Sequence, residues 1–297
     1  MRSPRRLAFS AALALPLALA GCSLLPTTRK LPVPKAPAVV QTVTAEQLVA
    51  LLNQRWDALQ TLTAKVNIQV TVDKPKQEVE TTIPSFPASI LLRKPQMVRV
   101  YGRVPVLGTE MFDMASDEKN FTVYIPSRRE AVKGSNTLKK RSDNPLENLR
   151  PGVFFDAMVV KGLEPDDVYM VTADSETVED PSKKHLLVKP EYVLNIMTPR
   201  PNSRQQNAER VVTFDRTTLL PYEQDIYNSD GIVETQVFYT AYREFDSVQY
   251  PATITIKRPL DHAQTVLTVT SVIQNQTLKD DQFQVTYPAG TQIKDHE

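Results

Sequence analysis

The sequence has few of the residues that most often carry chemistry or cross-links. Its 297 residues include one cysteine, three histidines, one tryptophan and eight glycines. A single cysteine excludes an internal disulfide, so a large apolar core must stabilise the fold. No P-loop, dinucleotide-binding fingerprint or Gly-x-Ser-x-Gly elbow is present. His185, His262 and His296 lack metal-ligand spacing. We therefore predict no metal, no cofactor and no enzymatic activity.

An excess of charge of one sign is also missing. The formal net charge is +1, and removal of residues 1–21 would leave 32 basic and 34 acidic side chains. This balance provides no strong positive field, so we predict that nucleic acid is not a partner. Beyond residue 21 no apolar run approaches the roughly 20 residues that a membrane-spanning helix needs.

The first residues predict a secretory signal. Residues 1–6 are basic, and residues 7–20 are apolar and too few to span a bilayer. Residues 19–22 read Leu-Ala-Gly-Cys, which resembles the bacterial lipobox. The resemblance implies cleavage before Cys22 and attachment of acyl chains to its thiol. The alternative is an ordinary signal followed by an incidental cysteine.

The predicted mature protein begins at Cys22 and is anchored to a membrane by its acyl chains. The next residue is Ser23 rather than aspartate, which in a cell with two membranes implies sorting to the periplasmic face of the outer membrane. Residues 22–43 contain four prolines and indicate an extended tether. We assign residues 1–21 to the signal peptide and 44–297 to one folded domain.

Two segments have helical patterns. Residues 44–59 carry apolar side chains at helical spacing, and Thr44 with Gln47 forms a capping-box pattern. Residues 151–162 begin with proline, end at Gly162 and are apolar nearly all round, which predicts a helix that is covered on two sides.

Most of the remaining chain alternates apolar and polar residues, which is typical of half-buried strands. We predict an α+β fold that is mainly antiparallel β, with helices on one face of the sheet. About eleven strands are expected, with a further short strand and turn after Phe283, and their ranges are 62–72, 86–92, 98–101, 121–125, 167–173, 184–197, 209–214, 222–228, 232–243, 252–257 and 264–273.

One loop carries apolar residues at its expected tip. Val106 and Leu107 lie between Pro105 and Gly108, which mark a turn. The two side chains either fold inward as core or form a protruding tip that enters a bilayer.

The order of these elements resembles the periplasmic lipoprotein carrier LolA and its outer-membrane receptor LolB. The likeness lies in residues 59–66 (Leu-Gln-Thr-Leu-Thr-Ala-Lys-Val), 93–95 (Arg-Lys-Pro) followed by 97–100, 115–121, and 283–290. The resemblance implies a half-open β-barrel whose concave apolar face is covered by helices. A barrel of this kind can hold acyl chains because its interior is lined by apolar side chains.

The resemblance also implies a ligand site and a lid contact. In the carrier an arginine before the proline holds the lid, but here that position is Lys94, with Arg93 beside it. Lysine cannot form the same two-pronged hydrogen bond, which leaves this lid mechanism open. The residues expected to line the ligand site, for which ordinary filled core is the competing interpretation, are Val66, Ile68, Ile90, Leu92, Val98, Val100, Phe154 and Met158.

Three functions follow as hypotheses. The leading hypothesis is an anchored protein that binds lipid or lipoprotein acyl chains during trafficking to the outer membrane, with a periplasmic carrier protein as a partner. The alternative is an envelope sensor or scaffold of the same fold with a filled interior, which binds a protein partner through its loops. The third is a hydrolase that acts on envelope lipids through dispersed carboxylates.

Overall fold

The fold is described by a computed structural model that covers residues 34–37, 39–74, 78–136, 150–179, 185–199 and 206–296. Within these ranges the chain forms one sheet of fourteen strands and two α-helices. The predicted signal peptide, Cys22, Ser23 and most of the predicted tether lie outside the described residues.

The elements alternate between long strands and short connections. The first half contains α1 (Ala45–Ala58), β1 (Thr61–Lys74), β2 (Val79–Arg93), β3 (Met97–Arg103), β4 (Glu110–Ser116), β5 (Asn120–Ile125), η3 (Pro126–Arg128), β6 (Glu130–Ser135) and α2 (Pro151–Met158). The second half contains β7 (Val168–Glu179), β8 (Leu186–Pro199), β9 (Gln206–Asp215), β10 (Leu220–Tyr227), β11 (Val233–Phe245), β12 (Val248–Arg258), η4 (Pro259–Asp261), β13 (Ala263–Gln274), η5 (Asp280–Phe283) and β14 (Gln292–His296).

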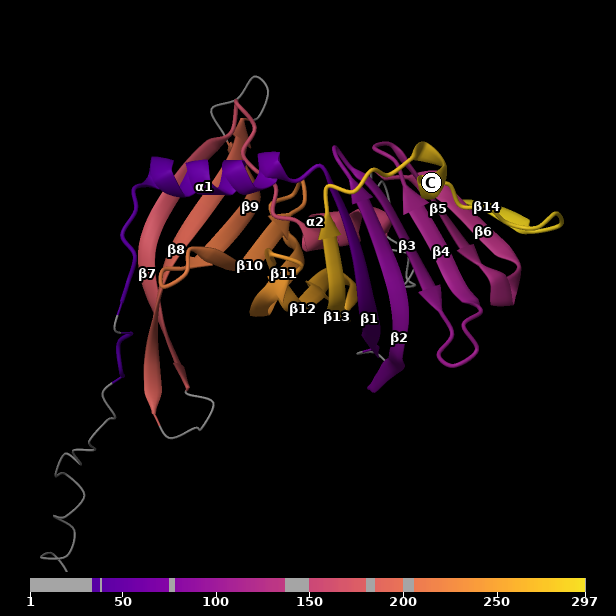
Figure 1. The fold of residues 1–297 in the computed structure, drawn as a ribbon, viewed down its shortest axis with the longest axis horizontal. Coiled ribbons are helices and arrows are strands. Elements are labelled where there is room, and N and C mark those ends of the chain that lie inside the picture. Colours follow the sequence, from indigo (N-terminus) through magenta and orange to yellow (C-terminus); the bar gives the residue numbers. More distant parts are fainter. Residues whose placement is uncertain are drawn as a thin grey trace, which may run out of the picture.

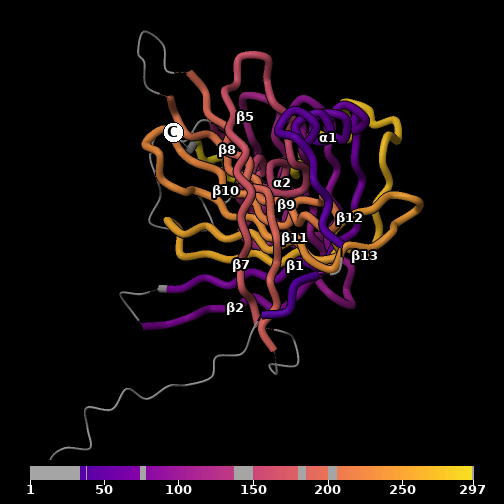
Figure 2. Tube along the Cα trace, turned by 90° about the vertical axis from the view of Figure 1, so that its left-hand side faces the viewer, coloured from indigo at the N-terminus to yellow at the C-terminus, as the bar shows by residue number. Residues whose placement is uncertain are grey.

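The strands form a single open sheet in the order β14-β6-β5-β4-β3-β2-β1-β13-β12-β11-β10-β9-β8-β7. Neighbouring strands are antiparallel except for the parallel pair of β14 with β6. Figure 1 shows the sheet curving around α2, with α1 lying across the half that contains β8 and β9. In the view turned by 90°, α2 again lies near the middle of the molecule (Figure 2). The predicted mainly antiparallel α+β fold, a half-open barrel with helices on its concave face, is confirmed.

Alternating side chains of the strands form two cores on this face. The larger core surrounds α2, with Phe154 and Phe155 against the inward residues of β1–β3 and β11–β13. The smaller core lies under α1, where Leu48 and Leu52 pack against β8 and β9. Each helix therefore covers its own part of the sheet.

The first helix agrees with its prediction to within one residue at each end. Thr44 caps it by accepting a hydrogen bond from the backbone N–H of Gln47 at 3.3 Å, and the Gln47 side chain accepts from the Thr44 N–H at 2.9 Å. This reciprocal pair confirms the capping box.

The second helix is shorter than predicted. It begins at Pro151 as expected but ends at Met158, and Val159 is already extended with φ −137° and ψ 137°. The prediction that it continues to Gly162 was wrong. Residues 159–162 have no regular structure, and Arg210 binds the carbonyls of Lys161 and Gly162, as described below.

Three strands differ from the prediction. The strands at 110–116 and 130–135 were not predicted. The last strand lies at 292–296, whereas the short strand expected after Phe283 is absent, since residues 284–288 have no regular structure. A tight turn joins β10 to β11, where the N–H of Gly231 donates to the Asn228 carbonyl at 3.0 Å.

The described end of the predicted tether follows the sheet. Lys35 forms a parallel bridge with Leu187 of β8. Further on, the N–H of Gln41 donates to the carbonyl of Arg216 at 2.8 Å. These contacts lead the chain along β8 and β9 into α1.

Candidate functional site

An apolar cavity opens where the end of α1 meets the end of α2. Its volume is about 310 Å³, and it lies above β10, β11 and β12. This volume is near the lower end of the ~300–1,000 Å³ range that is typical of small-molecule sites. The side chains that define it include Trp56, Leu59, Met158, Val160, Tyr242 and Tyr250.

Tyrosines that line this cavity contribute apolar rings, because their hydroxyl groups are bound elsewhere. The hydroxyl of Tyr242 donates to the Pro221 carbonyl at 2.7 Å, and that of Tyr250 donates to the Met158 carbonyl at 2.5 Å. Burial raises the pKa of both hydroxyls, so the rings are uncharged at neutral pH. These two hydroxyls therefore stay paired when an apolar group occupies the cavity, whose wall also includes Arg55, Gln249 and Gln274.

The end of α1 is fastened directly over the cavity. The Lys94 ammonium donates to the Trp56 carbonyl at 2.8 Å and lies 4.0 Å from the centre of the Trp56 ring. The same ring meets Phe155 of α2 edge-on, with 6.4 Å between ring centres. Gly162 lies so close that a Cβ atom there would be 2.7 Å from the Asn53 side-chain oxygen. Trp56 thus joins α1, α2 and the segment after α2.

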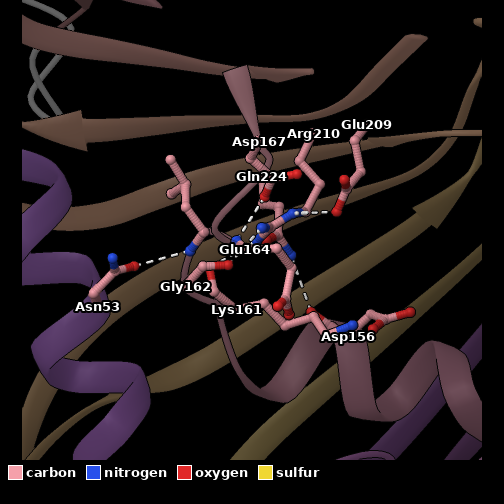
Figure 3. A network of polar contacts seen from close by, with 10 residues as sticks. Asn53, Asp156, Lys161, Gly162, Glu164, Asp167, Glu209, Arg210 and Gln224 are labelled. Carbon is pink, nitrogen blue, oxygen red and sulfur yellow. Dashed lines mark hydrogen bonds and ion pairs between the residues drawn. The ribbon is translucent and has the colours of Figure 1, made fainter. Parts of the chain in front are cut away.

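A network of polar contacts fixes the segment that follows α2 (Figure 3). Arg210 of β9 is buried and donates to the carbonyls of Lys161 at 2.7 Å and Gly162 at 2.9 Å. The side-chain oxygen of Asn53 on α1 accepts from the Leu163 N–H at 2.8 Å. One buried guanidinium therefore holds this extended segment between α1 and the sheet, which explains why α2 stops at Met158.

A buried amide lies beside the same network. Gln224 of β10 donates to the carbonyl of Asp156 at 2.9 Å and to the Tyr239 hydroxyl at 3.4 Å. Its own side-chain oxygen is buried without a hydrogen-bond partner. Burial also raises the pKa of Asp156, against the opposing effect of the nearby Lys161 and Arg210. One unsatisfied oxygen, on Gln224 of β10, therefore lies beside α2, and Tyr239 joins this amide to the wall of the apolar cavity.

The residues predicted to line a ligand site are all buried in the larger core. Met158 is the one that also lines the apolar cavity. The other seven pack against one another and against Phe155, and each is at most 2% exposed. Their role as ligand contacts stays a prediction, and the members of this set are Val66, Ile68, Ile90, Leu92, Val98, Val100 and Phe154.

The two residues predicted to contact the lid point in different directions. Lys94 holds α1 through Trp56, with one hydrogen bond in place of a two-pronged one. Arg93 instead donates to the Leu278 carbonyl at 2.9 Å and pairs with Asp280 in the C-terminal segment. Successive residues of a strand project to opposite faces, so these neighbours contact different parts of the chain.

The apolar loop between β3 and β4 projects into solvent. Val106 is fully exposed and Leu107 is 74% exposed, so neither side chain folds inward as core. Val106 has a φ of 68°, which is an outlier for a β-branched residue. Gly108 closes the turn by donating to the Val104 carbonyl at 2.9 Å.

A metal-binding cluster and a membrane-spanning helix are both absent from the described part of the chain. No group of three or more His, Cys, Asp or Glu side chains there could hold a metal ion. Among the same residues no helix is both long and apolar enough to cross a membrane.

No family model and no curated protein matches the sequence. Among solved structures, a LolA superfamily protein from Nitrosomonas europaea matches 82% of this chain and 99% of its own, with a TM-score of 0.50 and 14% identity. The chain has the LolA-like fold. An outer-membrane lipoprotein-sorting protein domain from Vibrio parahaemolyticus also matches, over 80% of this chain and 94% of its own, with a TM-score of 0.47 and 12% identity.

Identities this low concern the fold alone. The LolA-like fold accounts for the open curved sheet and for two helices on its concave side. The ligand of this protein is therefore inferred from its own cavity, loops and helix contacts.

Proposed function

We propose that this protein binds acyl chains of lipids or lipoproteins and is anchored to the periplasmic face of the outer membrane through Cys22. The observation that carries the proposal is the apolar cavity between α1 and the end of α2. Apolar surface removed from water contributes roughly 25 cal/mol per Å², so a cavity with satisfied polar atoms favours a hydrocarbon guest.

The position of the cavity supports an entry route. It lies beside Trp56 at the end of α1, where hydrogen bonds of Lys94, Asn53 and Arg55 hold the helix. Beyond Met158 the wall continues into the packed residues around Phe154. In this proposal an acyl chain enters at the cavity and reaches the predicted lining residues when α1 and α2 separate.

The exposed loop supports contact with a membrane. Val106 and Leu107 present two apolar side chains to solvent from a tight turn. Figure 1 places the β3–β4 loop at the end of the sheet away from α1. In this proposal the loop dips into the bilayer while the helix-covered side faces the periplasm, where a carrier protein would deliver its cargo.

The test is native mass spectrometry of the full chain purified from an envelope extract. We expect a bound lipid or acylated peptide, lost in Val248→Asp, because Val248 lines the cavity and a carboxylate would repel hydrocarbon. The matched control is Val168→Asp on β7, where the valine is exposed and does not line the cavity.

The proposal would be contradicted if the purified protein carries no lipid and takes up no fluorescent fatty acid. The packed interior would then favour the sensor or scaffold hypothesis. Retention of lipid by Val248→Asp, with Val168→Asp equal to it, would place the hydrocarbon elsewhere on the protein.

A further inference from the structure

The two edges of the sheet differ in their protection against pairing with another chain. β14 is five residues long, and Lys294 within it pairs with Glu130 of β6 at 2.6 Å. A short edge strand that carries a lysine is a common form of this protection, and proline and bulges are others. β7, at the opposite edge, is twelve residues long, contains no lysine, arginine or proline, and pairs with β8 without a register shift. The β7 edge is therefore the one open to a further strand.

The hydrogen bonds around β8 determine which groups of β7 face outward. The Pro190 carbonyl accepts from the Arg216 N–H at 3.0 Å at the end of β9, so Pro190 faces β9 and its neighbour Lys189 faces β7. Lys189 lies opposite Glu176, so Glu176 and every second residue from it bond to β8. The alternate residues direct their N–H and C=O groups to the open edge, and these are Tyr169, Val171, Ala173, Ser175 and Thr177.

This outward row of backbone groups has no backbone partner among the described residues. One of its donors is occupied locally, because the Ser175 N–H donates to the Asp174 carboxylate at 2.7 Å. At ~3.3 Å per residue the row from Tyr169 to Thr177 extends over roughly 26 Å. Figure 1 shows β7 at the outer side of the sheet, in a hairpin with β8 that extends beyond β9. The row is long enough for a complete partner strand.

The other side of the same hairpin already holds an extended chain. Lys35, in the segment before α1, donates its N–H to the Leu186 carbonyl at 2.8 Å and accepts from the Val188 N–H at 3.0 Å. This contact lies beyond the last residue pair between β8 and β9. The hairpin thus binds an added strand through main-chain groups, and the β7 side offers the same groups over a longer row.

The side chains of β7 define the chemistry of a partner. On the face that carries Glu176, Met170 is 53% exposed, and Asp174 and Glu176 are exposed as well. The whole strand has three acidic side chains and no basic one. Lys189 lies opposite Glu176, but its ammonium lies 2.9 Å from the centre of the Tyr222 ring. A partner strand is therefore complementary when it places cations beside the two carboxylates and an apolar side chain beside Met170.

We propose that β7 binds an extended, basic segment of another protein as an additional antiparallel strand. Main-chain hydrogen bonds along the outward row supply the affinity, and Asp174 and Glu176 select lysine or arginine in the partner. A second copy of this chain is a poorer partner, because its own β7 would bring acidic side chains to an acidic edge. No residue of β7 lines the apolar cavity, so the interaction does not depend on acyl binding.

The first experiment measures binding of a labelled threonine peptide to the full chain by fluorescence anisotropy. The peptide has lysine at its second and fourth positions and valine at its eighth, which in the antiparallel register lie opposite Glu176, Asp174 and Met170. We expect saturable binding with a Kd below about 1 mM. Weaker binding is expected when both lysines are replaced by glutamate, and none when the third, fifth and seventh residues are N-methylated. Equal binding of all three peptides, or no binding of the lysine peptide, would overturn the proposal.

Amide hydrogen exchange measured by NMR locates the bound peptide. In the free protein the N–H groups of Thr172 and Glu176 should exchange slowly, because they bond to β8, and that of Ala173 should exchange fast. The lysine peptide should slow exchange at Ala173 and leave the other two unchanged. Unaltered exchange at Ala173 would place the peptide elsewhere. Protection of Ala173 that grows with protein concentration in the absence of peptide would show that a second copy fills the edge, and either result contradicts the proposal.

Two variants at one position test strand addition. Ala173→Pro removes an outward N–H and places a ring on the open edge, while no bond to β8 is lost. We expect the affinity for the lysine peptide to fall at least about 10-fold, because the ring also blocks the neighbouring main-chain bonds. Ala173→Thr keeps the N–H in a residue that favours strands and should bind as the parent does. Equal affinity of the two variants would contradict strand addition.

A charge variant tests the selection of basic partners. Asp174→Asn combined with Glu176→Gln should weaken binding of the lysine peptide about 2- to 10-fold. The matched control combines Asp230→Asn with Asp246→Asn, which removes the same charge from two exposed turns. Loss of peptide binding in Val248→Asp would place the peptide in the apolar cavity, and would overturn the edge proposal while leaving the acyl-binding proposal intact.

Discussion

The two helices lie on the same face of one sheet, but different contacts hold them. In α2 five of eight residues are buried, including Phe154 and Phe155, and they form the centre of the larger core. In α1 two of fourteen residues are buried, Leu48 and Leu52, and hydrogen bonds with residues outside the helix secure its C-terminal end: Arg55 donates to the Leu219 carbonyl, and Lys94 donates to the Trp56 carbonyl. The difference indicates that α2 cannot leave without unmaking the larger core, whereas lifting α1 breaks a few polar contacts and exposes only the smaller core around Leu48 and Leu52. Access to the apolar cavity is therefore controlled at α1.

The largest loss of unfolding free energy is expected when a buried ring of α2 is removed. Phe154→Ala removes a ring that is 1% exposed and should cost about 3–5 kcal/mol of unfolding free energy, measured by urea denaturation. The comparison is Leu52→Ala on α1, which should cost less because its surroundings can collapse toward solvent. A smaller loss for Phe154→Ala than for Leu52→Ala would break the distinction between the two helices.

A smaller effect is expected where α1 touches the segment after α2. Gly162→Ala forces a Cβ to within 2.9 Å of the Trp56 ring, so it should push the end of α1 outward and cost about 1–3 kcal/mol. Trp56 is the only tryptophan, so a red shift of its emission reports the movement. The control is Gly152→Ala on α2, which meets open space and should stabilise the helix by up to about 1 kcal/mol. Unchanged emission in Gly162→Ala would show that α1 is not displaced.

Removal of the contacts between Lys94 and Trp56 should have a still smaller effect on stability. Lys94→Met deletes the hydrogen bond to the Trp56 carbonyl and the contact with its ring, a loss of about 1 kcal/mol. We also expect faster uptake of a fluorescent fatty acid in stopped-flow mixing. Lys133→Met is the control, since that lysine lies over Tyr287 on another part of the sheet. Equal uptake rates in both variants would contradict control of access at α1.

The smallest effect is expected on the pH dependence of the unfolding free energy. Burial raises the pKa of Asp156, so the folded chain holds this proton more tightly than the unfolded chain does. The stability therefore falls as pH rises from about 4, the ordinary aspartate value, through the raised pKa. Asp156→Asn should flatten this part of the profile and stabilise the protein at pH 7, measured by urea unfolding between pH 4 and 8. Asp230→Asn, in an exposed turn, is the control variant, and an unaltered slope in Asp156→Asn would refute the assignment.

Much of the fold could be predicted because its strands alternate cleanly. Residues 61–74 alternate buried and less buried side chains over most of their length, and the capping box located α1 from two residues. The strand at 110–116 was missed because its apolar residues, Met111, Phe112, Met114 and Ala115, do not alternate with polar ones. Asp113 lies on the face opposite Met114, where it is buried in a two-pronged ion pair with Arg99.

The apolar cavity could not be predicted for a related reason. Tyr239 and Tyr242 are three positions apart, and a regular strand would place them on opposite faces. Ala241 has a φ of 53° and drops out of the pairing between β11 and β12, so both rings reach the cavity. A single residue with positive φ inside a strand leaves no periodic signal in the sequence. The role of Lys94 at α1, by contrast, could be anticipated from its place before Pro95.

The pairing of β1 with β13 determines when the molecule can assemble. The Thr61 hydroxyl donates to the carbonyl of Gln276, 215 positions later in the chain. β1 therefore waits for almost the whole polypeptide before its second edge is covered, and contacts this distant in sequence slow folding. During synthesis the first six strands form a meander with an unprotected apolar edge, which is a site of misassembly. For the exported protein proposed above, such a delay keeps the chain unfolded until it has crossed a membrane, and a helper that shields β1 in the meantime would raise its yield.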